Sequence, residues 1–525
     1  MKINLSLPAN YVVENPHTIT DPAAIALWLE ELPVADSVAC ASDLLGAVKL
    51  LNRHPKRITT RQELMQRYLE LFMELIQRVR SLLQTRSYSE RHRNDDRFIQ
   101  LMEELSHEMG YGFKRVLLEL ITPAWRAGEE RQTTEAIYWT TQMLTFDLMF
   151  AFSDYRPEPR STWSEFMRLY LLAKQRKISR APIRDPYLAV ATTPSIGFAF
   201  RRAMLISILD PYKLRRGDVW HSYDYLSFHC KSAIITTFKV PEITGGHFLV
   251  DLKGQRKPQP FRLDNVPPRP REFLLLNVNP LNGVVHRHFK MLEVNPEVEI
   301  EGLENLEGGQ AMHLFRGMLV SWHISPTRRH ERIEEYDWLV ASCGLHDIWA
   351  ILHQDESEEQ AETEEVEIGH NLAQPLQGKR RAYRWRQTNF SASGVGVVLP
   401  ISEARALQVG QLVLTNSEAG NGNNRQRLGV VRRLIHRDTE NMEAGIQFLG
   451  GTITATRIYH REQPIPILIT DRGSGYNRVL ITPSKVFRQG RIIEIKTGKR
   501  TGYTVKAEKL LESTCCIERF EVSRR

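Results

Sequence analysis

Three residues of the segment NFSASG, namely Asn389, Ser391 and Gly394, have the types and spacing of half a nucleotide site. The Asn amide and the Ser hydroxyl both donate and accept hydrogen bonds, so they can bind a base edge or a phosphate oxygen. Glycine allows the backbone to approach a ligand closely. Small polar residues between two strands are also typical of a plain turn. The segment therefore predicts either a nucleotide site or a simple turn.

Arginines upstream of this segment can supply the cations that a phosphate-bearing ligand needs. Arg328, Arg329 and Arg332 lie in TRRHER, directly before a predicted strand. The guanidinium is a planar fork that pairs with phosphate and with guanine edges, and it can stack on a base. The Arg-x-x-x-Arg spacing lets two guanidinium groups converge on one ligand of diphosphate size. A solvated basic turn is the alternative interpretation of TRRHER.

A second arginine pair, Arg380 and Arg384, lies in GKRRAYR, close to NFSASG. We expect this segment to be part of the strand that enters the motif. Alternation along that strand places Trp385 on one face and Arg384 on the other. A strand fixed in its ladder cannot fold back over a ligand at its own end. We therefore favour Arg328 and Arg332 as ligand residues and keep Arg380 and Arg384 as the alternative.

The charge of the chain favours anionic partners. The net charge is +8, yet residues 355–367 hold eight acids and no basic residue, so omitting this run raises the net charge from +8 to +16. A basic surface of this kind attracts phosphates, nucleic acid or acidic lipid, and charge alone does not select among them.

The sequence lacks the motifs that indicate an enzyme or a metal site. The sequence contains no GxxxxGK[ST] loop, GxSxG elbow, HExxH pair or GxGxxG turn between strand and helix. His286 and His288 are expected to share one face of a strand without a third ligand. Five scattered cysteines form no CxxC pair. We predict a protein that is not an enzyme and that has no metal or cofactor.

No stretch of the chain has the composition of a signal peptide or a membrane span. The N-terminal segment MKINLSLPANYVVENP lacks an apolar core, and no window approaches ~18 uninterrupted apolar residues. We therefore expect a cytoplasmic protein.

The elements that must position these residues change in type along the chain. Residues 1–190 are predicted to form an antiparallel helical bundle, because caps such as Asp21–Pro22 precede apolar residues with helical spacing. A β-rich middle domain is expected at 210–325, from runs such as EFLLLNVN, VVHRHFKML and AMHLFRGMLVSWHI. Strand-like DWLVASCGLHDIWAIL and AYRWRQTNFSASGVGVVL are expected to belong to a further β domain at 326–450. A small C-terminal β domain is expected at 451–525. The fold class is thus multidomain α+β.

The acidic run has the composition of a disordered segment. We expect disorder at about 354–372, which strand-like segments flank on both sides. The run is therefore interpreted as an insertion within a β domain and not as a linker between domains.

Arg328, Arg332 and NFSASG together resemble the PilZ family of bacterial cyclic di-GMP receptors. That family combines an Arg-x-x-x-Arg loop with Asn/Asp-x-Ser-x-x-Gly in a six-stranded antiparallel β-barrel. The later runs RLGVVRRLIHR and EAGIQFLG are similar to its closing strands, and the resemblance covers about 325–450. LWLEELP, LLNRHPKR and CGLHDIW resemble a long multidomain subgroup with an N-terminal helical region. One departure is the long separation of Arg332 from Asn389, which includes the acidic insertion.

The resemblance implies a non-enzymatic receptor with cyclic di-GMP as its ligand. The arginines of TRRHER would hold phosphates and guanine faces, Asn389 and Ser391 would form hydrogen bonds, and Gly394 would permit close approach. Binding would rearrange the domains and signal to an unidentified protein partner through the helical bundle. One alternative is a degenerate PilZ-like scaffold that binds proteins without ligand. Another is a nucleic-acid-binding protein, which the dispersed basic residues disfavour.

Overall fold

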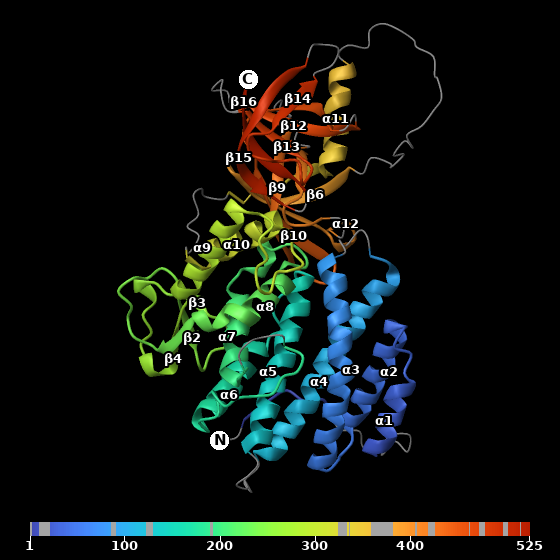
Figure 1. Cartoon of the computed structure of the whole chain (residues 1–525), viewed down its shortest axis with the longest axis vertical. Coiled ribbons are helices and arrows are strands. Elements are labelled where there is room, and N and C mark those ends of the chain that lie inside the picture. Colours follow the sequence, from blue (N-terminus) through green and yellow to red (C-terminus); the bar gives the residue numbers. More distant parts are fainter. Residues whose placement is uncertain are drawn as a thin grey trace. The chain divides into compact units, whose positions relative to one another are not determined.

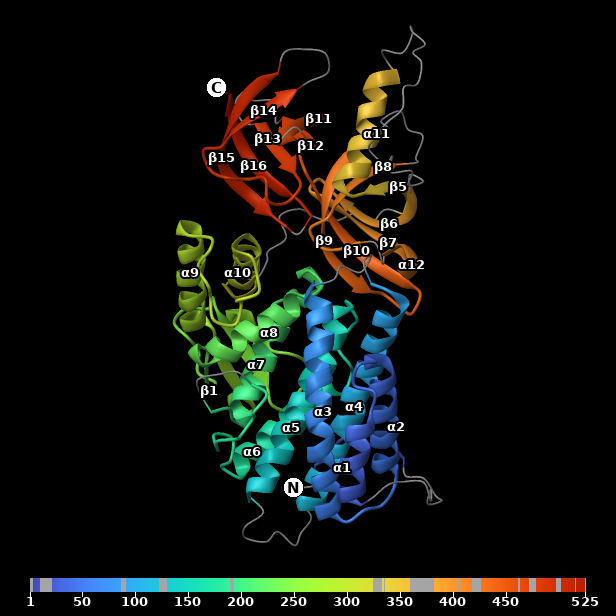
Figure 2. The same cartoon turned by 45° about the vertical axis from the view of Figure 1, so that its right-hand side comes forward.

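The computed structural model describes most of the chain, which divides into two compact units, Met1–Pro326 and Thr327–Arg525. The described residues are 3–9, 21–85, 91–121, 130–188, 193–323, 333–334, 336–358, 382–404, 407–417, 426–460, 463–471, 478–496, 502–514 and 516–524. Each unit is described by itself (Figures 1 and 2).

The first unit is mainly helical, as the sequence predicts for residues 1–190. Long helices α3, α4 and α5 run side by side in both views (Figures 1 and 2). The helices up to the sheet are α1 (Pro22–Glu31), α2 (Ser37–Arg53), α3 (Ile58–Thr85), α4 (Arg93–Leu120), α5 (Glu130–Ser153), α6 (Thr162–Gln175), α7 (Ile196–Ser207) and α8 (Asp218–His229), with 3-10 turns η2 (Pro211–Lys213) and η3 (Cys230–Ser232).

The helix start predicted at Asp21–Pro22 is confirmed by its cap, and α2 begins with a cap of the same kind. The Asp21 carboxylate accepts a hydrogen bond from the Ala24 amide at 2.9 Å, and Pro22 opens α1. The Asp36 carboxylate caps α2 by accepting from the Val38 amide at 3.0 Å. These carboxylates satisfy backbone donors that have no partner within the helix. Local sequence therefore determines where these helices begin.

The prediction of a β-rich region at 210–325 is wrong for most of its length. A small antiparallel sheet, in the order β1-β4-β2-β3 among the described residues, accompanies two helices. Its elements are β1 (Ile234–Thr237), β2 (His247–Asp251), β3 (Gln259–Pro260), η4 (Leu263–Asn265), η5 (Pro270–Glu272) and β4 (Phe273–Asn277). The runs VVHRHFKML and AMHLFRGMLVSWHI lie in helices α9 (Asn279–Val294) and α10 (Gly308–His323).

Helical spacing explains this correction. The buried residues of α10 recur every three or four positions, as a helix requires, and they are Ala311, Leu314, Phe315, Met318 and Trp322. Short apolar runs with aromatic residues fit a strand equally well before their packing partners are known. His286 and His288 accordingly lie on α9 and not on a strand, and the His288 imidazole Nδ1 is 3.0 Å from the Tyr225 hydroxyl.

The second unit begins with a closed antiparallel barrel, as the sequence predicts. Its strand order is β10-β7-β6-β5-β8-β9. The elements are β5 (Trp338–Cys343), α11 (Leu345–Glu358), β6 (Tyr383–Ser391), β7 (Gly394–Pro400), α12 (Ile401–Ala404), β8 (Leu412–Ser417), β9 (Arg427–His436) and β10 (Asn441–Phe448).

Two details of this barrel differ from the sequence prediction. The strand expected in DWLVASCGLHDIWAIL stops at Cys343, because Gly344 adopts a φ of +93° and helix α11 follows. This helix extends to Glu358, so the start of the stretch expected to be disordered is helical. The acidic residues beyond it lie outside the described residues. Strands β5 and β6, on either side of them, pair within the same barrel.

A second closed antiparallel barrel occupies the predicted C-terminal β domain. Its order is β11-β12-β13-β16-β15-β14. The strands are β11 (Thr452–His460), β12 (Gln463–Asp471), β13 (Arg478–Thr482), β14 (Ile492–Lys496), β15 (Tyr503–Ser513) and β16 (Glu518–Arg524). An apolar core fills it, and this core includes Ile467, Leu480, Ile495 and Phe520.

The two barrels share a second apolar core. Trp349 and Ile348 of α11 pack with residues of both barrels, among them Leu412 and Leu468. The Trp349 indole also donates a hydrogen bond to the Thr456 carbonyl of β11 at 2.6 Å. Burial of these side chains joins the barrels into one compact body. In the part of the chain that the structure describes, no helix is long and apolar enough to cross a membrane.

Candidate functional site on the first barrel

The Asn389–Gly394 motif forms the end of a β-hairpin. Ser391 of β6 pairs with Gly394 of β7, and the Ser391 hydroxyl donates to the Gly394 carbonyl at 3.2 Å. The turn is held from a third strand, because the Phe448 amide of β10 donates to the Ser393 carbonyl at 2.9 Å. The turn that the sequence allowed is thus present, and a ligand could contact only the outside of the barrel beside it.

Register places four residues of the motif region in one row across the sheet. Asn389 pairs with Gly396, Gly396 with Gly445, and Gly445 with Arg433, on strands β6, β7, β10 and β9. The next row, which includes Val397, has no exposed surface and faces the core. Because side chains alternate between faces, the row Asn389–Gly396–Gly445–Arg433 lies on the outside of the barrel. We call it the glycine row.

Asn389 is positioned by an irregularity in its strand. The register of β6 against β7 shifts between Gln387 and Asn389, so Thr388 is the additional residue of a bulge. The Asn389 amide donates to the Thr388 hydroxyl at 3.1 Å. A Cβ atom at Gly396 would lie 2.5 Å from the Asn389 amide nitrogen. The Asn389 side chain therefore occupies the space that a larger residue at Gly396 would take.

Packing within the barrel explains why residue 394 is a glycine. A Cβ atom there would collide with the Ile446 carbonyl oxygen of β10. The close approach that glycine allows at this position is therefore an approach of two barrel strands. This contact is independent of any ligand, so the glycine by itself does not identify a nucleotide site.

Arg328, Arg329, Arg332 and Arg380 lie outside the described residues. The residue directly after Arg332 is described, however, and it is bound to the motif. The Ile333 amide donates to the Phe390 carbonyl, and the Phe390 amide donates to the Ile333 carbonyl, both at 2.9 Å. The chain that follows TRRHER therefore enters the barrel beside NFSASG, although 56 residues separate Ile333 from Asn389 in the sequence.

Arg384 lies in the ladder, as its alternation with Trp385 predicts. Trp385 is fully buried and Arg384 is exposed. The Arg384 guanidinium lies 4.6 Å from the centre of the Trp338 ring on the neighbouring strand. This cation–π contact orients it along the barrel wall.

Sequence reasoning missed two further arginines near the motif. The Arg427 guanidinium stacks on Phe390 at 4.8 Å and on Phe448 at 5.2 Å, at the end of the barrel where the hairpin turns. Arg433 is the exposed end of the glycine row. The basic run VVRRLIHR was a usable signal, but only strand pairing shows which of its arginines shares a row with Asn389.

A comparison with protein families matched the helical unit. Residues 23–241 match the family described as "Cyclic-di-GMP receptor FimW, N-terminal domain". This match supports a relationship with a family of cyclic-di-GMP receptors. It covers helices α1–α8 and the start of the sheet, and it does not reach the first barrel. No curated protein matched the chain.

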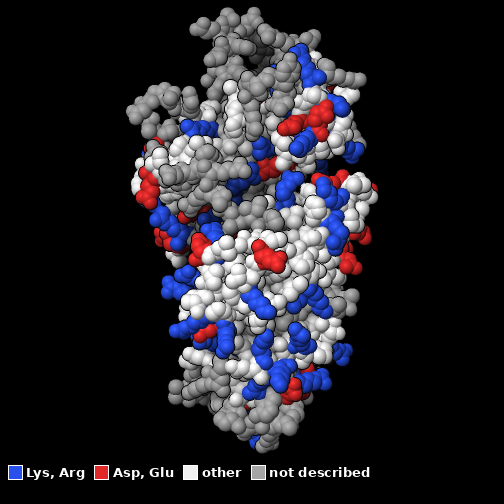
Figure 3. Space-filling view, turned by 90° about the vertical axis from the view of Figure 1, so that its left-hand side faces the viewer, with Lys and Arg blue, Asp and Glu red and all other residues white. Residues whose placement is uncertain are grey.

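The distribution of charge bears on the nucleic-acid alternative. On the face shown in Figure 3, Lys and Arg side chains lie singly or in small groups, with Asp and Glu between them. A groove that follows a nucleic-acid backbone requires clustered cations. The face in Figure 3 does not favour that function.

Proposed function

We propose that the chain is a non-enzymatic receptor for cyclic di-GMP that binds its ligand on the outside of the first, PilZ-like barrel. The observation that carries the proposal is the pairing of Ile333 with Phe390. Consecutive Cα atoms are ~3.8 Å apart, and Arg332 directly precedes Ile333, which pairs with the motif. The sequence separation of Arg332 from Asn389 is therefore no obstacle to a joint site.

The glycine row would offer a planar guanine a surface at Gly445, because the Asn389 side chain already covers Gly396. Gly396 and Gly445 have no side chains, whereas Asn389 and Arg433 stand at the two ends of the row. Neighbouring strands are ~4.8 Å apart, so the row is about 14 Å long. Asn389 and Ser391 would bind a base edge or phosphate oxygen, and Arg328 and Arg332 would hold phosphates by charge-assisted hydrogen bonds.

We propose that relay of the signal depends on the place of the arginines in the sequence. Arg328 and Arg332 come directly after the division between the two units at Pro326. A ligand that fixes this segment against the barrel would restrict the connection between the units. A partner that recognises the helical unit would then distinguish the bound from the free receptor. The FimW match of the helical unit supports this assignment to cyclic di-GMP signalling.

Calorimetric titration of the full chain with cyclic di-GMP tests the proposal. Each of Arg332→Ala and Ser391→Ala removes one ligand contact. We expect affinity to fall roughly 10- to 100-fold for the arginine and by about tenfold for the serine. Arg384→Ala is the matched control, because its guanidinium rests on Trp338.

Absence of heat at high micromolar ligand would refute the receptor function and would favour the ligand-free scaffold. Equal affinity in the wild type and both test variants would show that the ligand binds elsewhere. A loss of affinity in Arg384→Ala alone would identify Arg384, and not Arg332, as the arginine that binds the ligand.

A further inference from the structure

The helical unit contains a cavity of about 370 Å³ that is separate from the barrel motif. Its walls come from α3, α5, α8, residues 185–188 and the loop 302–305. Functional small-molecule pockets typically have volumes of about 300–1,000 Å³. The cavity is therefore large enough for a small organic ligand.

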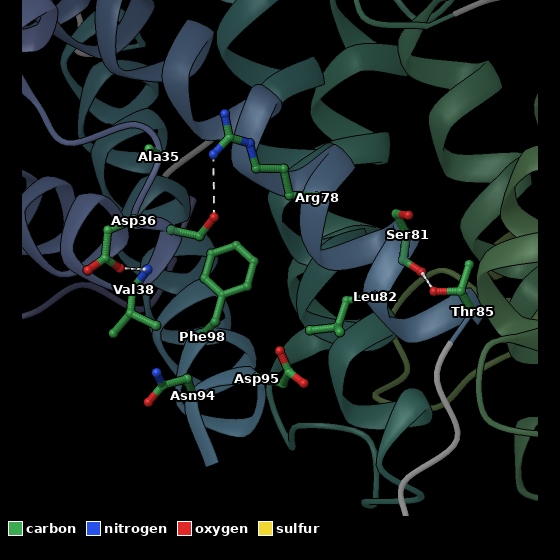
Figure 4. Close-up of a pocket in the computed structure, with 11 residues that line it drawn as sticks. Ala35, Asp36, Val38, Arg78, Ser81, Leu82, Thr85, Asn94, Asp95 and Phe98 are labelled. Atoms are coloured by element: carbon green, nitrogen blue, oxygen red, sulfur yellow. Dashed lines mark hydrogen bonds between the residues drawn. The ribbon is translucent and has the colours of Figure 1, made fainter. Parts of the chain in front are cut away.

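A second hollow in this unit, shown in Figure 4, is different in kind. Its polar groups bond mainly to one another: Asp36 caps α2, the Thr85 hydroxyl donates to the Ser81 carbonyl, and Arg78 donates to the Ser37 hydroxyl. These contacts explain the residues of the second hollow without a ligand.

The first cavity, by contrast, has a buried polar group on its lining that the described protein leaves without a hydrogen bond. The Arg80 Nε is buried and has no hydrogen-bond partner within the described residues, while the same guanidinium pairs with Asp224. The Tyr223 side chain, 4% exposed, lies beside it, and the Arg80 guanidinium is 5.4 Å from the centre of its ring. Buried polar groups are normally paired with protein or with an ordered molecule. Both side chains line the cavity.

The walls of the cavity are rigidly constructed. Arg202 is fully buried behind the wall. Its guanidinium donates to the side-chain Oε1 of Gln142 at 2.9 Å and to the Ser227 hydroxyl at 2.7 Å. Gly302, with a φ of +82°, lets its loop approach α8 so closely that a Cβ would lie 2.8 Å from the Asp224 carbonyl oxygen. Fixed donors and acceptors of this kind select a ligand by shape and hydrogen bonding.

Charge disfavours a phosphate in this cavity, even with Arg202 lying against the lining residue Tyr223. The lining carries one arginine, Arg80, and three carboxylates, Asp185, Asp224 and Glu304. Burial lowers the pKa of His221, so its imidazole is neutral near pH 7. A phosphate would meet net negative charge, whereas N–H groups would find acceptors.

The remaining lining favours a ring-containing molecule. The lining includes the aromatic residues Tyr187, Phe146, Tyr223 and Phe228 together with the amides of Gln84 and Asn305. The Gln142 amide also lines the cavity, but it is already bonded to Tyr138 and Arg202. Aromatic faces stack on heterocycles, and amides pair with their polar edges. We propose that this cavity is a second ligand site, for an uncharged nitrogen heterocycle of nucleoside size.

Ligand-observed NMR on the full chain tests the site with adenosine and guanosine as probes and with AMP and GMP as their charged counterparts. Gln84→Ala and Tyr187→Ala remove one amide and one ring from half-buried positions. Gln66→Ala, exposed on the same helix α3, is the matched control. Circular dichroism checks that each variant is folded.

We expect saturable binding of at least one nucleoside, weakened at least about tenfold in both cavity variants and unchanged in Gln66→Ala. The corresponding nucleotide should bind at least about tenfold more weakly than its nucleoside. No saturable signal for either nucleoside at about 1 mM would overturn the proposal and leave a water-filled cavity. Equal binding by wild type and both cavity variants, or tighter binding of the nucleotide, would also overturn it. Because the variants lie outside the barrel unit, these results are independent of the cyclic di-GMP site.

Discussion

Glu512 forms a buried ionic link between the two barrels, and its removal should loosen their junction. Glu512 of β15 pairs with Arg432 of β9 and with Arg519 of β16, the latter at 2.8 Å. Its side chain is only 10% exposed. Burial by itself would raise the pKa of this carboxyl group, but the hydrogen bonds and charges of Arg432 and Arg519 prevail and lower it to about 2. The contact matters because it is one of the connections through which the first barrel can influence the second.

The size of the effect follows from this lowered pKa. A free Glu titrates near ~4.3, so a pKa of about 2 in the folded protein means that folding favours the carboxylate by about 3 kcal/mol. The pKa is lower in the folded state, so this stabilisation is fully present above about pH 4.3 and is lost as the pH falls toward about 2. Glu512→Gln removes the negative charge and leaves the guanidinium groups of Arg432 and Arg519 without their shared carboxylate partner.

Hydrogen exchange measured by mass spectrometry on β9 and β15 peptides reports the loss locally. We expect exchange to accelerate roughly 100-fold in Glu512→Gln near neutral pH, since each ~1.4 kcal/mol corresponds to a factor of about ten. In thermal melts, the difference from wild type should shrink as the pH falls below about 4.3. Glu508→Gln, at a more exposed position of the same strand, should change exchange by no more than about twofold. Unchanged exchange in Glu512→Gln, or a difference that does not depend on pH, would refute the reasoning.

Three further substitutions test other parts of the structure. Gly394→Val should lower the melting temperature of the barrel unit by several degrees, because its side chain collides with the Ile446 carbonyl; a stable, wild-type-like melt would contradict that geometry. Gly302→Ala should destabilise the helical unit by about 1–3 kcal/mol, measured by urea unfolding, because φ is +82° and the backbone of Asp224 is in the way. Arg384→Ala should leave cyclic di-GMP affinity within about twofold of wild type in calorimetry, and a tenfold loss would assign this arginine to the site.

Local sequence patterns were enough to predict a helix or strand where its formation depends on its own residues. The cap at Asp21–Pro22 acts within the first turn of its helix, and the alternation around Trp385 acts along one strand. These features therefore predicted the helical region, the strands of both barrels and the exposed position of Arg384. The same reasoning failed for α9 and α10, because short apolar runs fit helix and strand alike until packing partners decide.

The sequence by itself determined the types of residue available to the candidate site and the hairpin that presents Asn389 and Ser391. Only the tertiary structure decided which distant residues join them. Closure of the barrel brings Ile333 beside Phe390, and strand register aligns Asn389, two glycines and Arg433. The cavity of the helical unit likewise combines α3 with α5, α8 and a loop at 302–305. Such groupings depend on contacts between residues far apart in the chain, and no local spacing encodes them.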